Sequence, residues 1–142
     1  MRDYKNILAW QKADDMTVAV YGATRSFPKD EVYSMTSQLR RAAYSVPANI
    51  AEGASRSSQK DYLHFLYVAS GSAAEVAYFL HLARRLEYLS DDIHSRLAAQ
   101  ADEASRVLTG LIHSVEKEVG LHASVSSSPK SPVSSLQSPV CP

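Results

Sequence analysis

The stretch from Gln38 to Lys60 constrains the fold most, because two helical patterns run along it side by side. Apolar residues recur every three or four positions from Met35 to Ile50, as they do on the buried face of an α-helix. Polar residues keep the same spacing beside them: Gln38, Arg41, Ser45, Asn49, Glu52 and Arg56. A helix with an apolar and a polar stripe, packed within an all-helical protein, accounts for both patterns.

Two residues are unusual inside helices. Pro47 has no amide to donate, and its ring clashes with the carbonyl four residues earlier, that of Ala43. We expect either one helix over residues 31–55 that kinks at Pro47, or two shorter helices with Pro47 in the first turn of the second. The apolar register continues across Pro47 and favours one kinked helix. Gly71 costs about 1 kcal/mol relative to Ala in mid-helix, which suggests that another backbone passes close to it.

Three further amphipathic stretches show the same periodicity. The residue before a proline is pushed out of the helical region, so the Phe27–Pro28 step ends the first helix. Asp30 is the expected N-cap of the helix that contains Pro47, and Ser57 or Ser58 that of the next helix. The predicted helices cover residues 6–26, 31–55, 59–88 and 91–119.

The short connections between these segments place consecutive helices antiparallel to each other. The predicted fold is therefore all-α, an up-down-up-down four-helix bundle formed by residues 1–119. Residues 120–142 are rich in Ser and Pro and contain few large apolar residues. Such a segment cannot bury enough surface to offset the entropy of ordering, so we expect it to be disordered.

A hairpin of the second and third helices also predicts which residues face each other. If the chain turns near Ser58, residues whose numbers sum to about 116 lie opposite each other. This pairing predicts a partly buried ion pair between Arg41 and Glu75 and places Asn49 deep between the helices. A buried amide needs partners, because leaving it unpaired costs about 1–3 kcal/mol. The expected structural polar network consists of Gln38, Arg41, Ser45, Asn49, Glu52 and Glu75.

Composition narrows the function classes. The formal net charge is zero, with 15 Lys and Arg against 15 Asp and Glu. A dedicated nucleic-acid binder usually has a basic excess or a basic face, so any such binding must come from a local patch. Residues 38–60 carry an excess of three positive charges, and residues 91–119 an excess of three negative charges. These two surfaces either attract each other between subunits or are simply solvated.

No feature of the sequence indicates secretion or membrane insertion. Cys141 is the only cysteine, which leaves no disulfide within the chain and no cysteine-based metal site. The N-terminal residues lack the apolar core of a signal peptide, and no apolar run approaches the roughly 18 residues that cross a membrane. We therefore expect a soluble cytoplasmic protein.

The segment QLRRAAYSVPANIAEGASRSS, residues 38–58, resembles the central motif of a known family. This is the four-helix-bundle family encoded in intervening sequences of bacterial 23S ribosomal RNA genes. The family is also matched at Leu8–Ala13, at Tyr21, at Phe27–Pro28, and at Gly71–Ser72 followed by Glu75. The resemblance as a whole spans residues 3–119.

The resemblance implies an antiparallel four-helix bundle that assembles as a homopentamer and whose molecular role is unsettled. It also extends, in fold and assembly, to the accessory proteins of diversity-generating retroelements. Those proteins bind a reverse transcriptase and nucleic acid through a basic surface. The neutral charge of this chain departs from that pattern.

The first functional hypothesis is that the protein binds RNA or DNA. The expected ligand is ribosomal RNA or an element-encoded RNA. The expected binding surface is a basic patch at the end of the bundle where the second helix turns into the third. Such contacts to phosphate oxygens weaken steeply as salt rises. The alternative is that these cations pair with carboxylates or are solvated. The hypothesis predicts that Arg56→Glu with Lys60→Glu abolishes RNA retention. The candidate residues are Arg40, Arg56, Lys60, Arg84 and Arg85.

The second hypothesis is a protein-interaction scaffold whose ring docks a partner enzyme such as a reverse transcriptase. Enzyme classes have little support. A di-iron bundle needs two Glu-x-x-His pairs on facing helices, whereas Asp91-x-x-His94 and His113-x-x-Glu116 fall on the same predicted helix. No Gly-rich phosphate loop or serine triad pattern occurs. We expect no catalytic residues, metal or cofactor.

Overall fold

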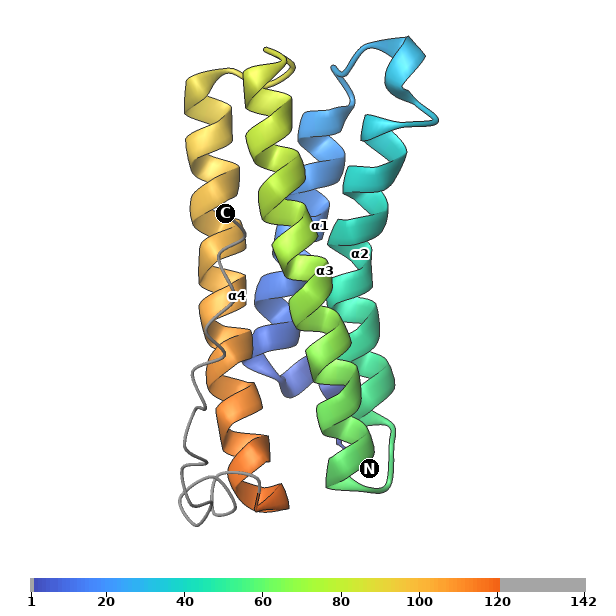
Figure 1. The fold of residues 1–142 in the computed structure, drawn as a ribbon, viewed down its shortest axis with the longest axis vertical. Helices are drawn as coiled ribbons and strands as arrows, with labels where there is room; N and C mark the ends of the chain where they lie inside the picture. The colour runs from blue at the N-terminus through green and yellow to red at the C-terminus, as the bar shows by residue number, and fades with distance from the viewer. Residues whose placement is uncertain (1, 121–142) are drawn as a thin grey trace, which may run out of the picture.

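Four long helices make up most of residues 2–120, the part of the chain described by this computed structural model (Figure 1). The predicted disordered tail lies outside the described residues, apart from Gly120. Two short 3-10 helices, η1 (Tyr4–Asn6) and η2 (Lys29–Glu31), precede α1 and α2. The long helices are α1 (Leu8–Thr24), α2 (Met35–Ala54), α3 (Gln59–Arg85) and α4 (Asp91–Val119).

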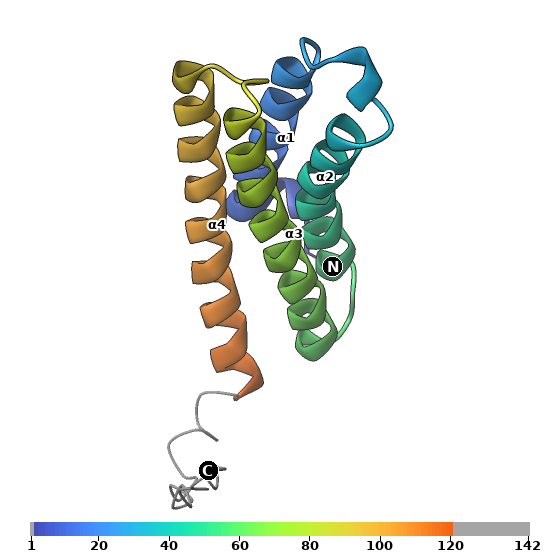
Figure 2. The ribbon, with the colours of Figure 1, turned by 45° about the horizontal axis from the view of Figure 1, so that its top comes forward.

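Each helix packs against two neighbours. α1 contacts α2 and α4, and α3 contacts the same two helices, so α1 lies diagonally opposite α3. Figures 1 and 2 show consecutive helices running in opposite directions, with the α1–α2 and α3–α4 connections at one end and the α2–α3 turn at the other. The predicted up-down-up-down bundle is confirmed.

The apolar stripes form one core between the four helices. Every predicted apolar position of α2 is buried, from Met35 to Ile50, as are Leu66 and Val76 of α3. Leu86 and Ile93 continue the apolar periodicity of the third and fourth predicted helices, but they are 46% and 43% exposed. For Leu86 the reason is that α3 ends at Arg85, three residues before the predicted end, and the chain then turns through the left-handed region at Glu87 (φ 62°). This turn brings Leu89 into the core instead.

The start of α2 also differs from the prediction. The chain forms η2 and a further turn before α2 begins at Met35, four residues later than expected. Asp30 is therefore not the N-cap. The carboxylate of Glu31 accepts the amide of Met35 at 3.1 Å and the hydroxyl of Ser34. The predicted cap of the third helix is confirmed, because Ser58 accepts from the amide of Asp61.

α2 runs without interruption through Pro47, so the alternative of two shorter helices is wrong. The carbonyl of Ala43 lacks its usual amide partner, because residue 47 is a proline. The hydroxyl of Thr17 on α1 lies 3.0 Å from this carbonyl and 2.8 Å from that of Ala13. Ala43 is fully buried. α1 thus supplies the donor that the proline removes from α2.

The close backbone approach occurs at Gly53 and not at Gly71. A Cβ on Gly53 would lie 2.9 Å from the Cβ of Phe65 and 3.1 Å from the carbonyl oxygen of Tyr62, where α2 meets α3. A Cβ on Gly71 would have nothing within 4 Å, and Gly71 is exposed. The expectation of a neighbouring backbone at Gly71 is therefore wrong within this chain.

Thr17→Val should destabilise the fold by about 1–2 kcal/mol, because it leaves a buried carbonyl without a donor. In the Pro47→Ala background residue 47 regains an amide that can bond to Ala43, so the same substitution should cost distinctly less. Urea unfolding of the four proteins in this double-mutant cycle measures the difference. An equal cost in both backgrounds would show that Thr17 does not compensate for the proline.

Gly53→Ala and Gly71→Ala should have opposite effects on stability. At Gly53 the added methyl group meets backbone and a ring-bearing side chain, so we expect a loss of about 1–3 kcal/mol. At Gly71 the methyl group enters open space in mid-helix, so we expect a gain of up to about 1 kcal/mol. Thermal unfolding of the two variants checks the prediction, and a shared sign would contradict it.

Candidate functional site: a basic groove between α1 and α2

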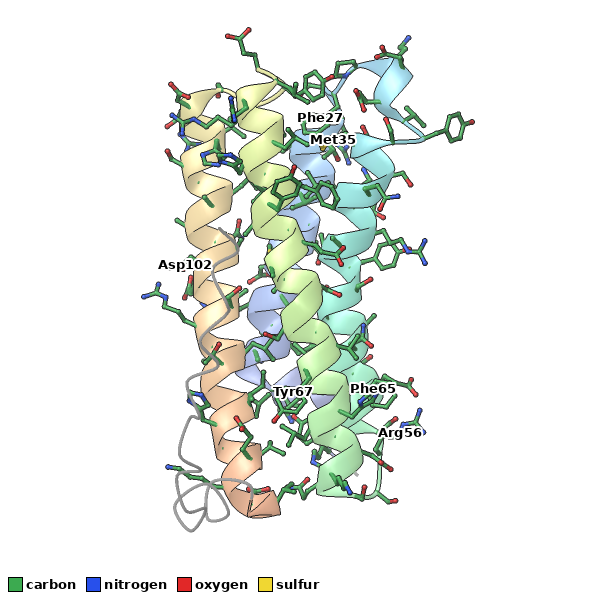
Figure 3. All side chains as sticks on the ribbon, viewed as in Figure 1. Phe27, Met35, Arg56, Phe65, Tyr67 and Asp102 are labelled. Carbon is green, nitrogen blue, oxygen red and sulfur yellow. The ribbon has the colours of Figure 1, made fainter. Side chains whose placement is uncertain are left out.

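The five cations of the predicted patch do not gather at one place. Arg56 and Lys60 lie beside the α2–α3 turn, whereas Arg84 and Arg85 lie in the last turn of α3, at the opposite end of the bundle. In Figure 3, Arg56 lies at the end of the bundle opposite Phe27 and Met35. A single interface at the α2–α3 end therefore cannot include all five residues.

Two of these cations are already paired with carboxylates. Arg56 contacts Glu52 at 2.5 Å, and its guanidinium lies 4.8 Å from the centre of the Phe65 ring. Arg84 contacts Asp91 at 3.0 Å. Such exposed pairs contribute little to stability, but they lower the positive charge that a ligand would meet. The α2–α3 end is a surface of mixed charge.

The predicted polar network is a chain of local bonds along α2. The hydroxyl of Ser45 donates to the carbonyl of Arg41, and the amide of half-buried Asn49 donates to the carbonyl of Ser45, both at 2.7 Å. Gln38 is exposed. Arg41 and Glu75 are also exposed, and within residues 2–120 they form no ion pair. The expected Arg41–Glu75 pair is thus wrong within the chain, which leaves the Arg41 guanidinium available.

A groove of about 470 Å³ lies between the end of α1, η2 and the first half of α2, open to solvent. Its volume falls in the range of small-molecule and cofactor sites. Four cations line it, and none of the described residues that line it is a carboxylate. The lining comprises the cations Arg25, Lys29, Arg40 and Arg41, the hydroxyl residues Thr24, Thr36 and Ser37, and Tyr21, Phe27, Val32 and Tyr44.

Arg40 is held in this groove by two contacts. Its Nε donates to Oγ1 of Thr24 at 2.8 Å, and its guanidinium lies 4.7 Å from the centre of the Tyr21 ring. A cation over an aromatic face is attracted by the ring's quadrupole. Neither contact uses the two terminal nitrogens of the guanidinium, which are the atoms that bind an anion in a forked geometry.

The pairing argument that was applied to the second and third helices would not have found this site. For helices over residues 6–26 and 31–55, facing residues sum to about 57, which puts Arg40 opposite Thr17. The structure places Arg40 against Tyr21 and Thr24 because α2 begins four residues later than predicted. Arg25 and Lys29 carried no signal of their own, because each is a single cation near the end of a predicted helix. Their convergence depends on η2, which the sequence did not indicate.

Glu31 holds the η2 segment that carries Lys29. Its carboxylate accepts hydrogen bonds from Ser34, from the Met35 amide and from the hydroxyl of Tyr88 at 2.9 Å. These bonds, with that of Ser34 the largest, lower the pKa of the Glu31 carboxyl below its usual value. The hydrogen bond that Tyr88 donates to Glu31, aided by burial, raises the pKa of the Tyr88 hydroxyl.

Within residues 2–120, no three or more His, Cys, Asp and Glu side chains are grouped so that they could hold a metal ion. No helix of this part of the chain combines the length and the apolar character needed to span a membrane.

Comparison with known proteins places the chain in a family. The model of the 23S rRNA-intervening sequence proteins matches residues 5–110. A crystal structure of a protein of unknown function from the S23 ribosomal protein family of Bacteroides thetaiotaomicron has the same fold, with a TM-score of 0.69 and 24% sequence identity. The match covers 74% of this chain and 98% of that one. No curated protein matches the chain.

Glu31→Gln should lower the melting temperature at pH 7 by a few degrees, because the neutral amide is a weaker acceptor at the start of α2. Since the pKa of Glu31 is lowered in the folded state, its contribution is present above the usual value of 4.5 and is lost as the pH falls through the folded pKa. The difference between the two proteins should therefore shrink in acid, as measured by thermal unfolding from pH 7 to about pH 3. Asp30→Asn is the matched control, and a pH-independent difference would refute the prediction.

Proposed function

This chain belongs to the 23S rRNA-intervening sequence protein family, and we propose that it is a non-enzymatic protein that binds RNA in the basic groove between α1 and α2. The observation that carries the proposal is the convergence of Arg25, Lys29, Arg40 and Arg41 on one groove without a lining carboxylate. This location replaces the α2–α3 end, where Arg56 is neutralised by Glu52.

The chemistry of the groove suits a nucleic acid. Lys and Arg bind phosphate oxygens, and aromatic rings stack on unpaired bases. Tyr21 and Tyr44 both line the groove and are 39% and 46% exposed. A single strand offers both phosphates and unstacked bases, whereas the bases of a duplex are already stacked. Single-stranded RNA is therefore the ligand that fits the lining best.

We also propose that the protein acts in the cytoplasm as a homo-oligomer, with the homopentamer that the resemblance implies as the expected form. Support comes from the outer face of α3, where Tyr67, Val68 and Tyr78 are between 41% and 58% exposed. Exposed apolar residues grouped on one face are typical of protein contact sites. A ring would present one groove per subunit, so weak single sites would combine into tighter binding.

The second candidate function is a scaffold that docks a partner enzyme such as a reverse transcriptase. The same exposed face of α3 favours it, since a face of this kind can bind another protein as well as another copy. In this reading the cations of the groove are solvated and RNA is not retained. Binding to RNA at low salt therefore separates the two functions.

The nuclease-treated protein should bind a single-stranded RNA of about 12 nucleotides. With four cations engaged, the logarithm of the affinity should fall with a slope of about −2.8 against the logarithm of salt, roughly a 50-fold loss between about 50 and 200 mM. Lys29→Glu with Arg41→Glu should weaken binding at least about tenfold and flatten the slope by about 1.4. Fluorescence anisotropy measures both quantities.

Lys60→Glu with Arg85→Glu is the matched control, because it makes the same charge change at exposed positions outside the groove. This control should bind with nearly the wild-type slope. A loss confined to the control would move the interface away from the groove. If the wild-type protein fails to bind even at about 50 mM salt, the RNA proposal falls and the scaffold function is favoured.

A further inference from the structure

The hydroxyl of Thr36 is a buried donor without a partner, and it lies in the lining of the groove. Thr36 is 5% exposed, and its Oγ1 has no hydrogen-bond partner within residues 2–120. Threonines in α1 satisfy their hydroxyls on the carbonyl four residues earlier, as Thr24 does on Val20 at 2.8 Å. Thr36 is the second residue of α2, so residue 32 lies before the helix, and the Thr36 hydroxyl makes no such bond. A buried hydroxyl without a partner is costly and calls for an explanation.

The backbone around Thr36 presents further donors. α2 begins at Met35, whose amide is taken by Glu31. Within residues 2–120 no hydrogen bond occupies the amides of Thr36 and Ser37, the next two residues of the first turn. Free amides at a helix N-terminus favour an anion, and here they accompany a recessed hydroxyl and four cations. The Glu31 carboxylate already takes the Met35 amide. The remaining charged groups that line the groove are cations, and the free amides and the Thr36 hydroxyl can donate to a ligand that accepts.

The amount of charge in one place indicates which anion fits. An internal phosphodiester of RNA carries one negative charge, and successive phosphates lie along an extended strand. The four cations instead converge on a hollow of about 470 Å³. A terminal phosphate carries a charge of about −1.5 to −2 near neutral pH and three acceptor oxygens, and a diphosphate or triphosphate carries more. Clustered phosphates match this site better than the backbone of a strand does.

On the basis of the proposed RNA binding, we propose that the groove recognises the phosphorylated 5′ end of an RNA strand. The hydroxyl of Thr36 and the Arg40 guanidinium bind the clustered phosphates. Tyr44, which lines the same groove with its ring partly exposed, stacks on the adjoining base. A free nucleoside triphosphate has the same chemistry, so the experiment must separate it from an RNA end.

The test compares RNAs of one sequence, about 12 nucleotides long, that carry a 5′-hydroxyl, a 5′-monophosphate or a 5′-triphosphate. Binding to the full chain is measured at fixed salt, with ATP as a competitor. Affinity should rise in that order, with at least a tenfold difference between the first and the last RNA. ATP should compete more weakly than the 5′-triphosphate RNA, because it lacks the contacts of the following nucleotides.

Thr36→Val is the decisive variant, because it removes the hydroxyl without changing the charge or the shape of the side chain. It should reduce the preference for the 5′-triphosphate over the 5′-hydroxyl RNA at least threefold. Thr109→Val, on the exposed side of α4, is the control and should leave this preference unchanged. The melting temperature of Thr36→Val should not fall, since the variant buries no unpaired hydroxyl.

Several outcomes would overturn the inference, and they can be distinguished from a failure of RNA binding itself. Equal, salt-dependent affinity for the three RNAs would refute end recognition while the proposed RNA binding stands. Competition by ATP as strong as that of the 5′-triphosphate RNA would assign the groove to a free nucleotide. If no RNA binds, and Lys29→Glu with Arg41→Glu instead reduces the size of the assembly in light scattering, the groove receives carboxylates from a second copy.

Discussion

The missing amide of Pro47 is the constraint on which the arrangement of α1 and α2 depends. Of the four long helices, α2 has the most buried residues, and an unpaired carbonyl at the fully buried Ala43 would be costly. The hydroxyl of Thr17 can reach this carbonyl only at one rotation of α1 about its axis and one position of α1 along α2. A proline that would break an isolated helix thus helps to specify how two helices pack.

The groove follows from this alignment. One turn beyond Thr17 on α1 comes Tyr21, and about one turn before Ala43 on α2 comes Arg40, so that the guanidinium rests on the ring. Thr24 then accepts from the same arginine. Beyond this point the helices no longer face each other directly, because η2 lies between them and α2 begins late. The space left open is the groove, and its walls are the last turns of α1 and the first turns of α2.

Periodicity was sufficient for the fold because the apolar stripes of four helices can be buried together in few ways. The buried positions of α2 and the uninterrupted helix through Pro47 could both be predicted from the register of its apolar residues. Helix ends were less predictable, since Glu31 caps α2 through its side chain from outside the helix. Arg41 and Glu75 show a second limit of prediction from sequence. They were predicted to face each other across two helices, but both side chains are exposed to solvent. Arg25 and Lys29 could not be assigned to a site, because only the three-dimensional path of η2 brings them to Arg40.

A net charge of zero is compatible with binding a polyanion when the charges are segregated. Six of the 15 acidic residues lie on α4, where residues 91–119 carry an excess of three negative charges. Both arginines of this helix are used in local pairs, Arg96 with Asp92 and Arg106 with Asp102. α4 lies diagonally opposite α2, so these carboxylates lie on the far side of the bundle from Arg41. Over such a distance, salt screens much of their repulsion of a bound phosphate, since the Debye length is about 8 Å at physiological ionic strength. The α4 carboxylates therefore oppose the attraction between the groove cations and a bound phosphate only weakly. Because the net charge is zero, the molecule as a whole does not attract a polyanion over long distances. A protein built in this way should favour a ligand whose charge is concentrated at one point over a ligand whose charge is spread along a chain.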